Sequence, residues 1–149
     1  MGSRITPATL TVTVTEAITL NSVDLGCTNA LSIASIGEID QRILSVPTAS
    51  EIVIANLGVA DSAGTYKRSG LKYIRITNMD DTNFIRLRIK DTDNNEQADF
   101  KVLKGQSFIL SESVISTAAG SFAAWEDIET ISAQADTAAV DIQLYVALA

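Results

Sequence analysis

The sequence predicts a single-domain, all-β protein, a jelly roll or β-sandwich of about 8–10 strands. Residues 72–110 carry the clearest evidence, because they contain four strand-like segments joined by polar turns and no segment with helical periodicity. Similar turn signals recur about every 8–12 residues along the chain. With 149 residues, 46% of them hydrophobic, only two prolines and eight glycines, the chain can bury a core without disulfides or metals.

The first predicted strand spans residues 9–20. Leu10, Val12 and Val14 alternate with threonines, which is the pattern of a half-buried strand. Glu16 falls in the apolar phase of this pattern, so it indicates a bulge, an edge strand, or two short strands with a break near this residue. Apolar residues at 31–36 add a short strand.

The next two strands are predicted at 39–46 and 51–57. Pro47 ends the first of them, because proline cannot donate to a ladder. Residues 58–70 are rich in Gly, Ser and Ala and are interpreted as a loop. This loop carries a compact basic and aromatic group, which makes it a candidate for ordering by a partner; a solvated loop is the alternative.

A hairpin is predicted from strands at 71–78 and 84–91, joined by a polar turn. Matching the apolar faces of the two strands places Arg75 opposite Arg86. Arg75, Arg86 and Arg88 are therefore expected to share one outward face of the sheet.

Further strands are predicted at 98–103, 106–111 and 138–147. Residues 113–127 lack clean strand periodicity and form either a helical turn or a long connection. The inward positions of the predicted strands define the expected core: Leu10, Val12, Val14, Ile52, Ile54, Ile74, Ile76, Ile85, Leu87, Ile89, Phe100, Val102, Phe108, Val140, Ile142, Leu144 and Val146.

Residues 1–8 are expected to be a flexible tail, and residues 9–149 to form the sandwich domain. The first residues lack the apolar run of a signal peptide, and no stretch has the roughly 18 apolar residues that a membrane span needs. A net charge of −7 argues against nucleic acids and membranes as partners, because both attract basic surfaces. Cys27, the single cysteine, is expected to be a small, buried or half-buried residue.

The protein is not expected to be an enzyme, and no catalytic residues are assigned. It has no histidine, and its serines lie in neither a GxSxG nor an SxxK motif. The segment DTDNNE (91–96) places oxygen-bearing side chains close together, but it lacks the glycine and the glutamate of an EF-hand loop. It is interpreted as a polar turn, with a looser calcium site as the alternative, so neither a cofactor nor a metal is expected.

Trp125, the single tryptophan, lies among alanines and glycine. Small residues around one large ring suggest a segment fitted closely against another surface, so Trp125 is interpreted as an anchor in the core or in an interface. Stacking on a sugar ring is the alternative.

Three segments in the C-terminal half resemble small virion proteins of tailed bacteriophages. They are YIRITNMDDTNFIRLRI (73–89), FKVLKGQSFIL (100–110) and ADTAAVDIQLYVALA (135–149). The matching features are Arg75-Ile76-Thr77-Asn78 followed by Asp80 or Asp81, Thr82 and Asn83, then Phe100, Leu103 and Gly105, and finally Ala135-Asp136-Thr137-Ala138-Ala139.

This resemblance implies a non-enzymatic jelly-roll or β-sandwich module, such as a capsid decoration (cement) protein. Such a protein is made in the host cytoplasm and stabilises the head shell from the outer surface of the virion. The resemblance implies the major capsid protein as a partner and self-association, most often as a trimer. The alternative is a carbohydrate- or receptor-binding module of a phage tail or head fibre, which an exposed aromatic platform would favour.

The predicted arginine face offers a docking hypothesis. Arginines on adjacent strands repel one another unless acids lie nearby, so this face is expected to meet carboxylates of a neighbouring subunit or of the capsid protein. Pairing within the chain, with Glu51 or Asp141, is an equal alternative. The residues proposed to bind a partner are Arg75, Arg86, Arg88, Tyr66, Lys67, Arg68 and Trp125.

Overall fold

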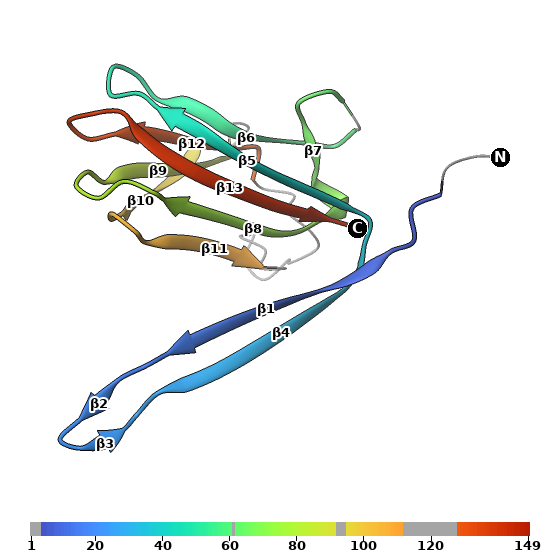
Figure 1. Cartoon of the computed structure of the whole chain (residues 1–149). Coiled ribbons are helices and arrows are strands. Elements are labelled where there is room, and N and C mark those ends of the chain that lie inside the picture. Colours follow the sequence, from blue (N-terminus) through green and yellow to red (C-terminus); the bar gives the residue numbers. More distant parts are fainter. Residues whose placement is uncertain (1–3, 61, 92–94, 112–127) are drawn as a thin grey trace.

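The computed structural model describes residues 4–60, 62–91, 95–111 and 128–149 (Figure 1). Its regular structure is β apart from one turn of 3-10 helix, η1 (Arg68–Gly70), so the prediction of an all-β sandwich is confirmed. The strands are β1 (Ala8–Glu16), β2 (Thr19–Leu20), β3 (Val23–Asp24), β4 (Cys27–Ile36), β5 (Glu38–Val46), β6 (Ile52–Gly58), β7 (Tyr66–Lys67), β8 (Leu71–Asn78), β9 (Ile85–Asp91), β10 (Glu96–Val102), β11 (Ser107–Ser111), β12 (Thr130–Ala135) and β13 (Val140–Leu148).

Two sheets form the body of the molecule. One has the order β11-β8-β13-β5, and the other has the order β10-β9-β12-β6-β7. Apart from the short β7, the body strands pair from the ends of the chain inward: β5 with β13, β6 with β12, β8 with β11, and β9 with β10, all antiparallel. This nested pairing, completed by the β13–β8 and β12–β9 ladders, is the topology of a jelly roll.

Alternating apolar residues on the body strands fill the space between the two sheets. On β9, for example, Ile85, Leu87 and Ile89 are buried, whereas Arg86 and Arg88 are half-buried on the other face. Each isoleucine or leucine removed from water in this way stabilises the fold by about 1.5–3 kcal/mol. The confirmed core predictions are Ile54, Ile74, Ile76, Ile85, Leu87, Ile89, Val102, Val140, Ile142, Leu144 and Val146, with Ile52 and Phe108 partly buried against them.

β8 and β9 do not form the predicted hairpin. β8 lies in the four-stranded sheet and β9 lies in the five-stranded sheet, so the segment between them crosses from one sheet to the other. Arg75 is therefore not opposite Arg86, and the expected common face of Arg75, Arg86 and Arg88 was wrong. A hairpin and a crossing turn the same apolar residues inward, and alternation alone does not distinguish them.

Asn78, at the end of β8, holds this crossing in place. Its side chain is fully buried, and Nδ2 donates hydrogen bonds to the backbone carbonyls of Asn83 (2.9 Å) and Val102 (3.2 Å). Oδ1 accepts a hydrogen bond from the backbone N–H of Asp80 (2.9 Å), and the Asn78 carbonyl accepts one from Gly105 (3.0 Å). One buried amide thus joins the turn after β8 to the end of β10.

The first predicted strand lies outside the sandwich. β1 pairs with β4 in a two-stranded ribbon that projects from the body, and β2 and β3 continue this ribbon to its tip (Figure 1). We call residues 8–36 the arm. Of the three alternatives that Glu16 indicated, the structure has the break between two strands, because β1 ends at Glu16 and β2 begins at Thr19. The short strand expected at 31–36 is the end of the longer β4, and the sandwich begins at β5 rather than at residue 9.

Two residues predicted in the core are exposed as a consequence of strand placement. Val14 is 43% exposed on the arm, and Leu10 and Val12 are only partly buried at its base, away from the main core. Phe100 lies on the edge strand β10 and is 38% exposed, with its ring 4.9 Å from that of Phe108. Alternation identifies one covered face of a strand, but it does not say which element covers that face or how completely.

β12 was not predicted, although it lies between β9 and β6 in the middle of its sheet. Its buried residues include Ser132 and Ala133, small side chains that carry little strand propensity. The preceding segment, 113–127, which was predicted to be a helical turn or a long connection, lies outside the described residues.

A β-bulge marks the base of the arm. Two residues of β4 oppose one residue of β1 there, and one of the two, Ser35, has a positive φ of 63°. Gly37 follows directly, and its N–H donates a hydrogen bond to the carbonyl of Leu148 (2.9 Å) at the end of β13. Because a bulge bends and twists a ribbon, it helps to direct the arm away from the sheet that β5 joins.

Candidate functional site

The arm is the best candidate for a functional site, because it presents apolar side chains that the body does not cover. Its register places Leu10 opposite Ile33 and Val12 opposite Leu31, so these four side chains share one face of the ribbon. Val14 extends the same face outward, while the threonines of β1 occupy the other face. We call the first of these the apolar face of the arm.

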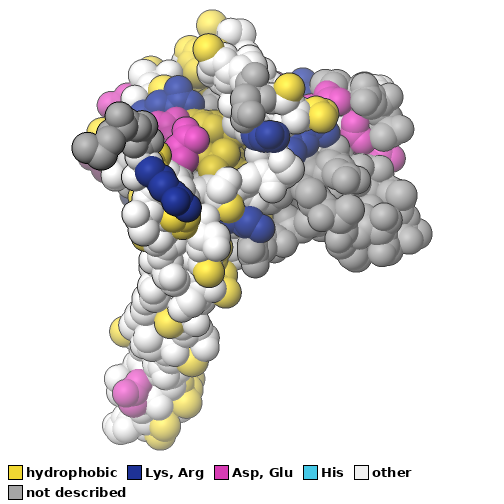
Figure 2. Space-filling model, turned by 90° about the vertical axis from the view of Figure 1, so that its right-hand side faces the viewer, with side chains coloured by type: hydrophobic (Ala, Val, Ile, Leu, Met, Phe, Trp, Pro, Cys, Tyr) yellow, Lys and Arg dark blue, Asp and Glu magenta, His cyan; other side chains and the backbone are white. Residues whose placement is uncertain are grey.

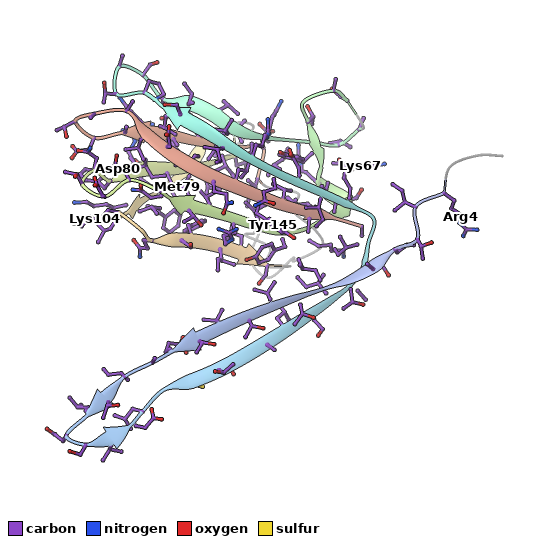
Figure 3. The ribbon with its side chains drawn as sticks, in the orientation of Figure 1. Arg4, Lys67, Met79, Asp80, Lys104 and Tyr145 are labelled. Atoms are coloured by element: carbon purple, nitrogen blue, oxygen red, sulfur yellow. The ribbon has the colours of Figure 1, made fainter. Side chains whose placement is uncertain are left out.

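The body covers only the base of this apolar face. Ile33 and Ile36 are 2% and 6% exposed, and they pack in one cluster with Tyr73 of β8 and Ala147 of β13. The rings of Tyr73 and Tyr145 meet edge to face in the same region, with their centroids 6.0 Å apart. Figure 3 shows Tyr145 on the side of the body that is nearest to the arm. The arm is thus anchored at one end by a small second core.

Farther from the body, the apolar side chains of the arm are open to water. Figure 2 shows hydrophobic side chains along the arm as far as its tip. Contiguous exposed apolar surface marks an interaction site, and a two-stranded ribbon is only marginally stable in water by itself. The large apolar residues of the arm that are 43–56% exposed are Val14, Ile18, Leu20, Val23, Leu25 and Leu31.

The tip of the arm is a two-residue turn that the sequence signalled only weakly. Asn21 and Ser22 have φ values of 49° and 65°, between the paired residues Leu20 and Val23. Positive φ at both central residues is the requirement of a type I′ hairpin turn, for which Asn-Gly is the usual pair. Because serine replaces the glycine, the turn was missed, and with it the hairpin that makes β1 and β4 partners.

A groove of about 310 Å³ lies where the arm approaches the outer face of the four-stranded sheet. Within it, the guanidinium of Arg75 lies 5.6 Å from the centre of the Tyr145 ring, and it donates hydrogen bonds to Gln143 (3.0 Å) and to Thr77. Among the described residues, no carboxylate contacts Arg75. The groove is lined by Leu10, Thr11, Val12, Thr13, Val14, Tyr73, Arg75, Ile109 and Tyr145.

The outer face of the four-stranded sheet continues the apolar lining beyond the groove. Ile109 of β11 lies opposite Arg75 and is 39% exposed. On the edge strand β5, Ile39 and Ile43 are 47% and 62% exposed, and they point to the same side of the sheet as Tyr145. The arm and this sheet therefore present apolar surfaces on the two sides of the groove, and among the described residues that line it Arg75 is the one cation.

Arg86 and Arg88 lie on the other sheet and are paired within the chain. Glu51 accepts hydrogen bonds from Arg86 (3.0 Å) and Arg88 (2.9 Å), and it forms an ion pair with Lys90 (3.1 Å). Asp99 accepts two hydrogen bonds from Arg88, of 2.6 and 2.7 Å. The pairing with Glu51 that the sequence offered as an alternative is therefore present. It neutralises the charges of these two arginines within the chain, so their position on the sheet requires no carboxylate from another protein.

The ion pairs lower the pKa of both carboxyl groups. Partial burial works in the opposite direction for Glu51, but the hydrogen bond from Lys90 and the charges of Arg88 and Lys90 outweigh it, so the pKa of Glu51 lies below its ordinary value. The hydrogen bonds from Arg88 lower the pKa of Asp99 in the same way. Both carboxylates are thus ionised at neutral pH, as the ion pairs require.

Tyr66, Lys67 and Arg68 do not form an exposed loop tip. Tyr66 is buried and Lys67 half-buried in β7, which pairs with β6, and Arg68 begins η1. The Tyr66 hydroxyl donates a hydrogen bond to Asp40 and accepts one from Arg42 (2.6 Å). Burial and the hydrogen bond to Asp40 raise the pKa of Tyr66 to about 12. These contacts fasten the loop to the edge strand β5.

Trp125, the remaining residue proposed to bind a partner, and residues 92–94 of the DTDNNE turn lie outside the described residues. In the part of the chain that the structure describes, no three His, Cys, Asp or Glu side chains are grouped to hold a metal ion. The same residues include no helix long and apolar enough to cross a membrane. Cys27 is exposed on the arm, so its predicted burial was wrong.

Comparisons with known proteins add no identification. A scan against protein-family models matches none of them, and searches of curated proteins and of solved structures return no significant match. The resemblance to tailed-phage virion proteins therefore stays a prediction, and function has to be argued from the arm and the groove.

Proposed function

We propose that this protein is a non-enzymatic structural protein of a virion, a decoration or cement protein that stabilises the head shell of a tailed bacteriophage. The observation that carries the proposal is the arm, a ribbon with an exposed apolar face attached to a body whose core is filled by its own strands. The main core includes no residue of the arm, and the second core covers only its base, so the outer part of the apolar face is available for binding another chain.

The arrangement of surfaces suits a protein that binds several subunits at once. The arm projects from the body in one direction (Figure 1). The outer face of the four-stranded sheet presents a second apolar surface, which includes Ile39, Ile43 and Ile109. A cement protein gains affinity by avidity, because separate weak contacts with neighbouring subunits hold it together. Self-association and binding to the major capsid protein are both part of this proposal.

The sequence resemblance supports the same role and concerns the body alone. Its segments include the crossing after Asn78, the turn at Gly105, where φ is 70°, and the last strand, β13. The arm has no counterpart in the resemblance. We infer that the body supplies the shared structural module, and that the arm supplies contacts particular to this chain.

The proposal is tested on head shells purified from the tailed phage that encodes this chain, after deletion of its gene. Added protein should occupy regular positions on the outer surface of the shells in electron cryomicroscopy and raise the temperature at which they break. Substituting Leu20→Ser together with Val23→Ser, both in the arm, should lower occupancy at least tenfold.

The matched control changes the same residue types on the body. Leu103 and Val53 are 50% and 56% exposed, close to the 54% and 56% of Leu20 and Val23. Leu103→Ser together with Val53→Ser should leave occupancy unchanged. Shells that bind no protein at all would contradict the proposed role, whatever the arm does.

One observation suits the alternative role, a carbohydrate- or receptor-binding module of a tail or head fibre. A polar pocket of about 420 Å³ lies beside Asp40, Arg42 and Tyr66, and hydroxyl-rich ligands bind to side chains of this kind. This alternative predicts that the protein is found on fibres rather than on the shell. It also predicts that Arg42→Ala, rather than the arm variant, lowers attachment of the phage to host cells.

A further inference from the structure

We propose that the arm of one molecule binds in the groove of a neighbouring molecule of the same chain, where Glu16 of the arm pairs with Arg75 of the neighbour. This inference rests on the assembly role proposed above, and it names the surface and the partner for self-association. It is tested on the isolated protein, so its failure is distinguishable from a failure to bind shells.

The two surfaces match in their apolar character. The apolar face of the arm is covered at Ile33 but open at Val14 and Leu31. The groove and the sheet beside it expose Ile109 and Ile43. Packing the outer part of one arm on the sheet of a neighbour would remove both surfaces from water.

The charges of the two surfaces are complementary. Residues 8–36 contain two charged residues, Glu16 and Asp24, and no lysine or arginine. Glu16 continues the apolar phase of Val14, lies opposite Cys27 and does not line the groove of its own molecule. Within the described part of the chain, neither Glu16 nor Arg75 forms an ion pair. An apolar surface with one carboxylate thus meets an apolar surface with one guanidinium.

Every copy of the chain carries both an arm and a groove, so copies that exchange arms can form a closed oligomer in which no arm and no groove is left unfilled. Two copies related by a two-fold axis fill both grooves, and three copies in a ring fill all three. The base of the apolar face is covered by the body of its own molecule, so only the part of the ribbon from Val14 to its tip is open. This part is about 30 Å long and about 10 Å wide, so its face offers on the order of 300 Å². Two exchanged arms and the surfaces they cover then bury about 1,200 Å², the lower end of the range for stable interfaces.

The first measurement is sedimentation velocity of the unmodified protein between about 1 and 100 µM. We expect species at two or three times the chain mass of 15.8 kDa. Glu16→Arg and Arg75→Glu should each weaken association at least tenfold, because each puts two like charges at the contact. Glu96→Arg, the same change of charge at an exposed position on β10, should leave association unchanged. Protein that stays monomeric at the highest concentration would overturn the proposal.

Charge reversal also separates contacts between molecules from effects within one molecule. The double variant carrying both reversals should associate to within about threefold of the unmodified protein. An equimolar mixture of the two single variants should form mixed species, because the arginine arm of one molecule meets the glutamate groove of the other. Circular dichroism of each variant checks the fold, and a mixture of folded variants that does not associate would overturn the proposal.

Cysteine cross-linking gives a test that leaves both charges in place. Cys27 lies opposite Glu16 in the arm, and Ile109 lies opposite Arg75 in the sheet. If Glu16 and Arg75 meet between molecules, Ile109→Cys brings the new thiol next to Cys27 of the neighbour. Mild oxidation should then give covalent oligomers for Ile109→Cys but not for a control, Val53→Cys, on the other sheet. Equal cross-linking of both variants would count against the proposed contact.

Discussion

The rings of Tyr73 and Tyr145 meet edge to face, with centroids 6.0 Å apart, where the arm contacts the jelly roll. Ile33 and Ala147 complete the same cluster, and both are almost fully buried. This cluster is small in comparison with the main core, and the ribbon beyond it is held by its own β1–β4 and β2–β3 hydrogen bonds. We therefore expect the arm to open more readily than the body.

The first prediction concerns this anchor. Ile33→Ala should cost about 2–5 kcal/mol of the free energy that keeps the arm closed, because it leaves a cavity against Tyr73. Hydrogen exchange should accelerate at the amides of β1 and β4 and stay unchanged at the centre of β13. Leu31→Ala, on the same strand but 43% exposed, should have an effect below about 0.5 kcal/mol. Equal effects of the two variants would show that the base of the arm is not anchored as described.

The second prediction concerns the main core. Ile142 is fully buried in β13, and Ile142→Ala should lower the free energy of unfolding by about 2–5 kcal/mol. Ile43 lies opposite the next residue along β13 and is 62% exposed, so Ile43→Ala should change stability by less than about 0.5 kcal/mol. Urea denaturation of both variants measures the difference. A larger loss for Ile43→Ala would mean that the faces of the sheet are reversed.

Asn78 gives the third prediction. Asn78→Asp keeps the shape of the side chain but replaces the Nδ2 donor with an oxygen that faces the carbonyls of Asn83 and Val102. Loss of two buried hydrogen bonds and repulsion between oxygens should cost about 3 kcal/mol or more at neutral pH. Asn29→Asp, at an exposed position of the arm, is the control and should unfold within about 0.5 kcal/mol of the unmodified protein. An Asn78→Asp protein as stable as the control would show that the side chain of Asn78 does not hold the crossing between the two sheets in place.

The fourth prediction is the pH dependence that Glu51 produces. The pKa of Glu51 in the folded protein lies below its ordinary value of 4.5, so ionised Glu51 stabilises the fold fully above about pH 4.5, and this contribution is lost as the pH falls through the folded pKa. Glu51→Gln should therefore lower stability by about 1–3 kcal/mol at pH 7 and have little effect near pH 2. Thermal unfolding from pH 2 to 7 tests this.

A control for Glu51 is Glu38→Gln, because Glu38 is exposed and forms no ion pair with a described residue. Its stability should follow that of the unmodified protein across the whole pH range. If the stability of Glu51→Gln, plotted against pH, runs parallel to that of the unmodified protein at every pH, the ion pairs of Glu51 are excluded as the cause of the pH dependence.

The body was predictable from sequence because its strands have one apolar face. Alternation located residues such as Ile76, Leu87 and Ile142 correctly, since each points into the space between two sheets. It did not separate a hairpin from a crossing between sheets, because both turn the same residues inward. It also missed β12. The buried residues of this strand include Ser132 and Ala133, whose small side chains give no alternating apolar pattern, and the neighbouring strands bury them.

The candidate site was predictable only in part, because it depends on where the arm lies. Pairing of Arg86 and Arg88 with Glu51 was among the sequence alternatives. Glu51 directly precedes β6, and it reaches the two arginines of β9 across the intervening strand β12. The setting of Arg75 was not foreseeable, since the groove exists only once β1 leaves the sandwich. The exposure of Val14 has the same cause: its pattern indicates a covered face, but the described part of the body covers only the base of the arm.

The central claim is that the apolar face of the arm is covered by another chain in the working protein. Hydrogen exchange at the amides of β1 and β4 tests it most directly, measured on dilute monomer and on protein bound to shells. The account predicts that these amides exchange at least tenfold more slowly in the assembled protein, while those at the centre of β13 remain equally protected in both. Equal, rapid exchange of the arm in both states would contradict it.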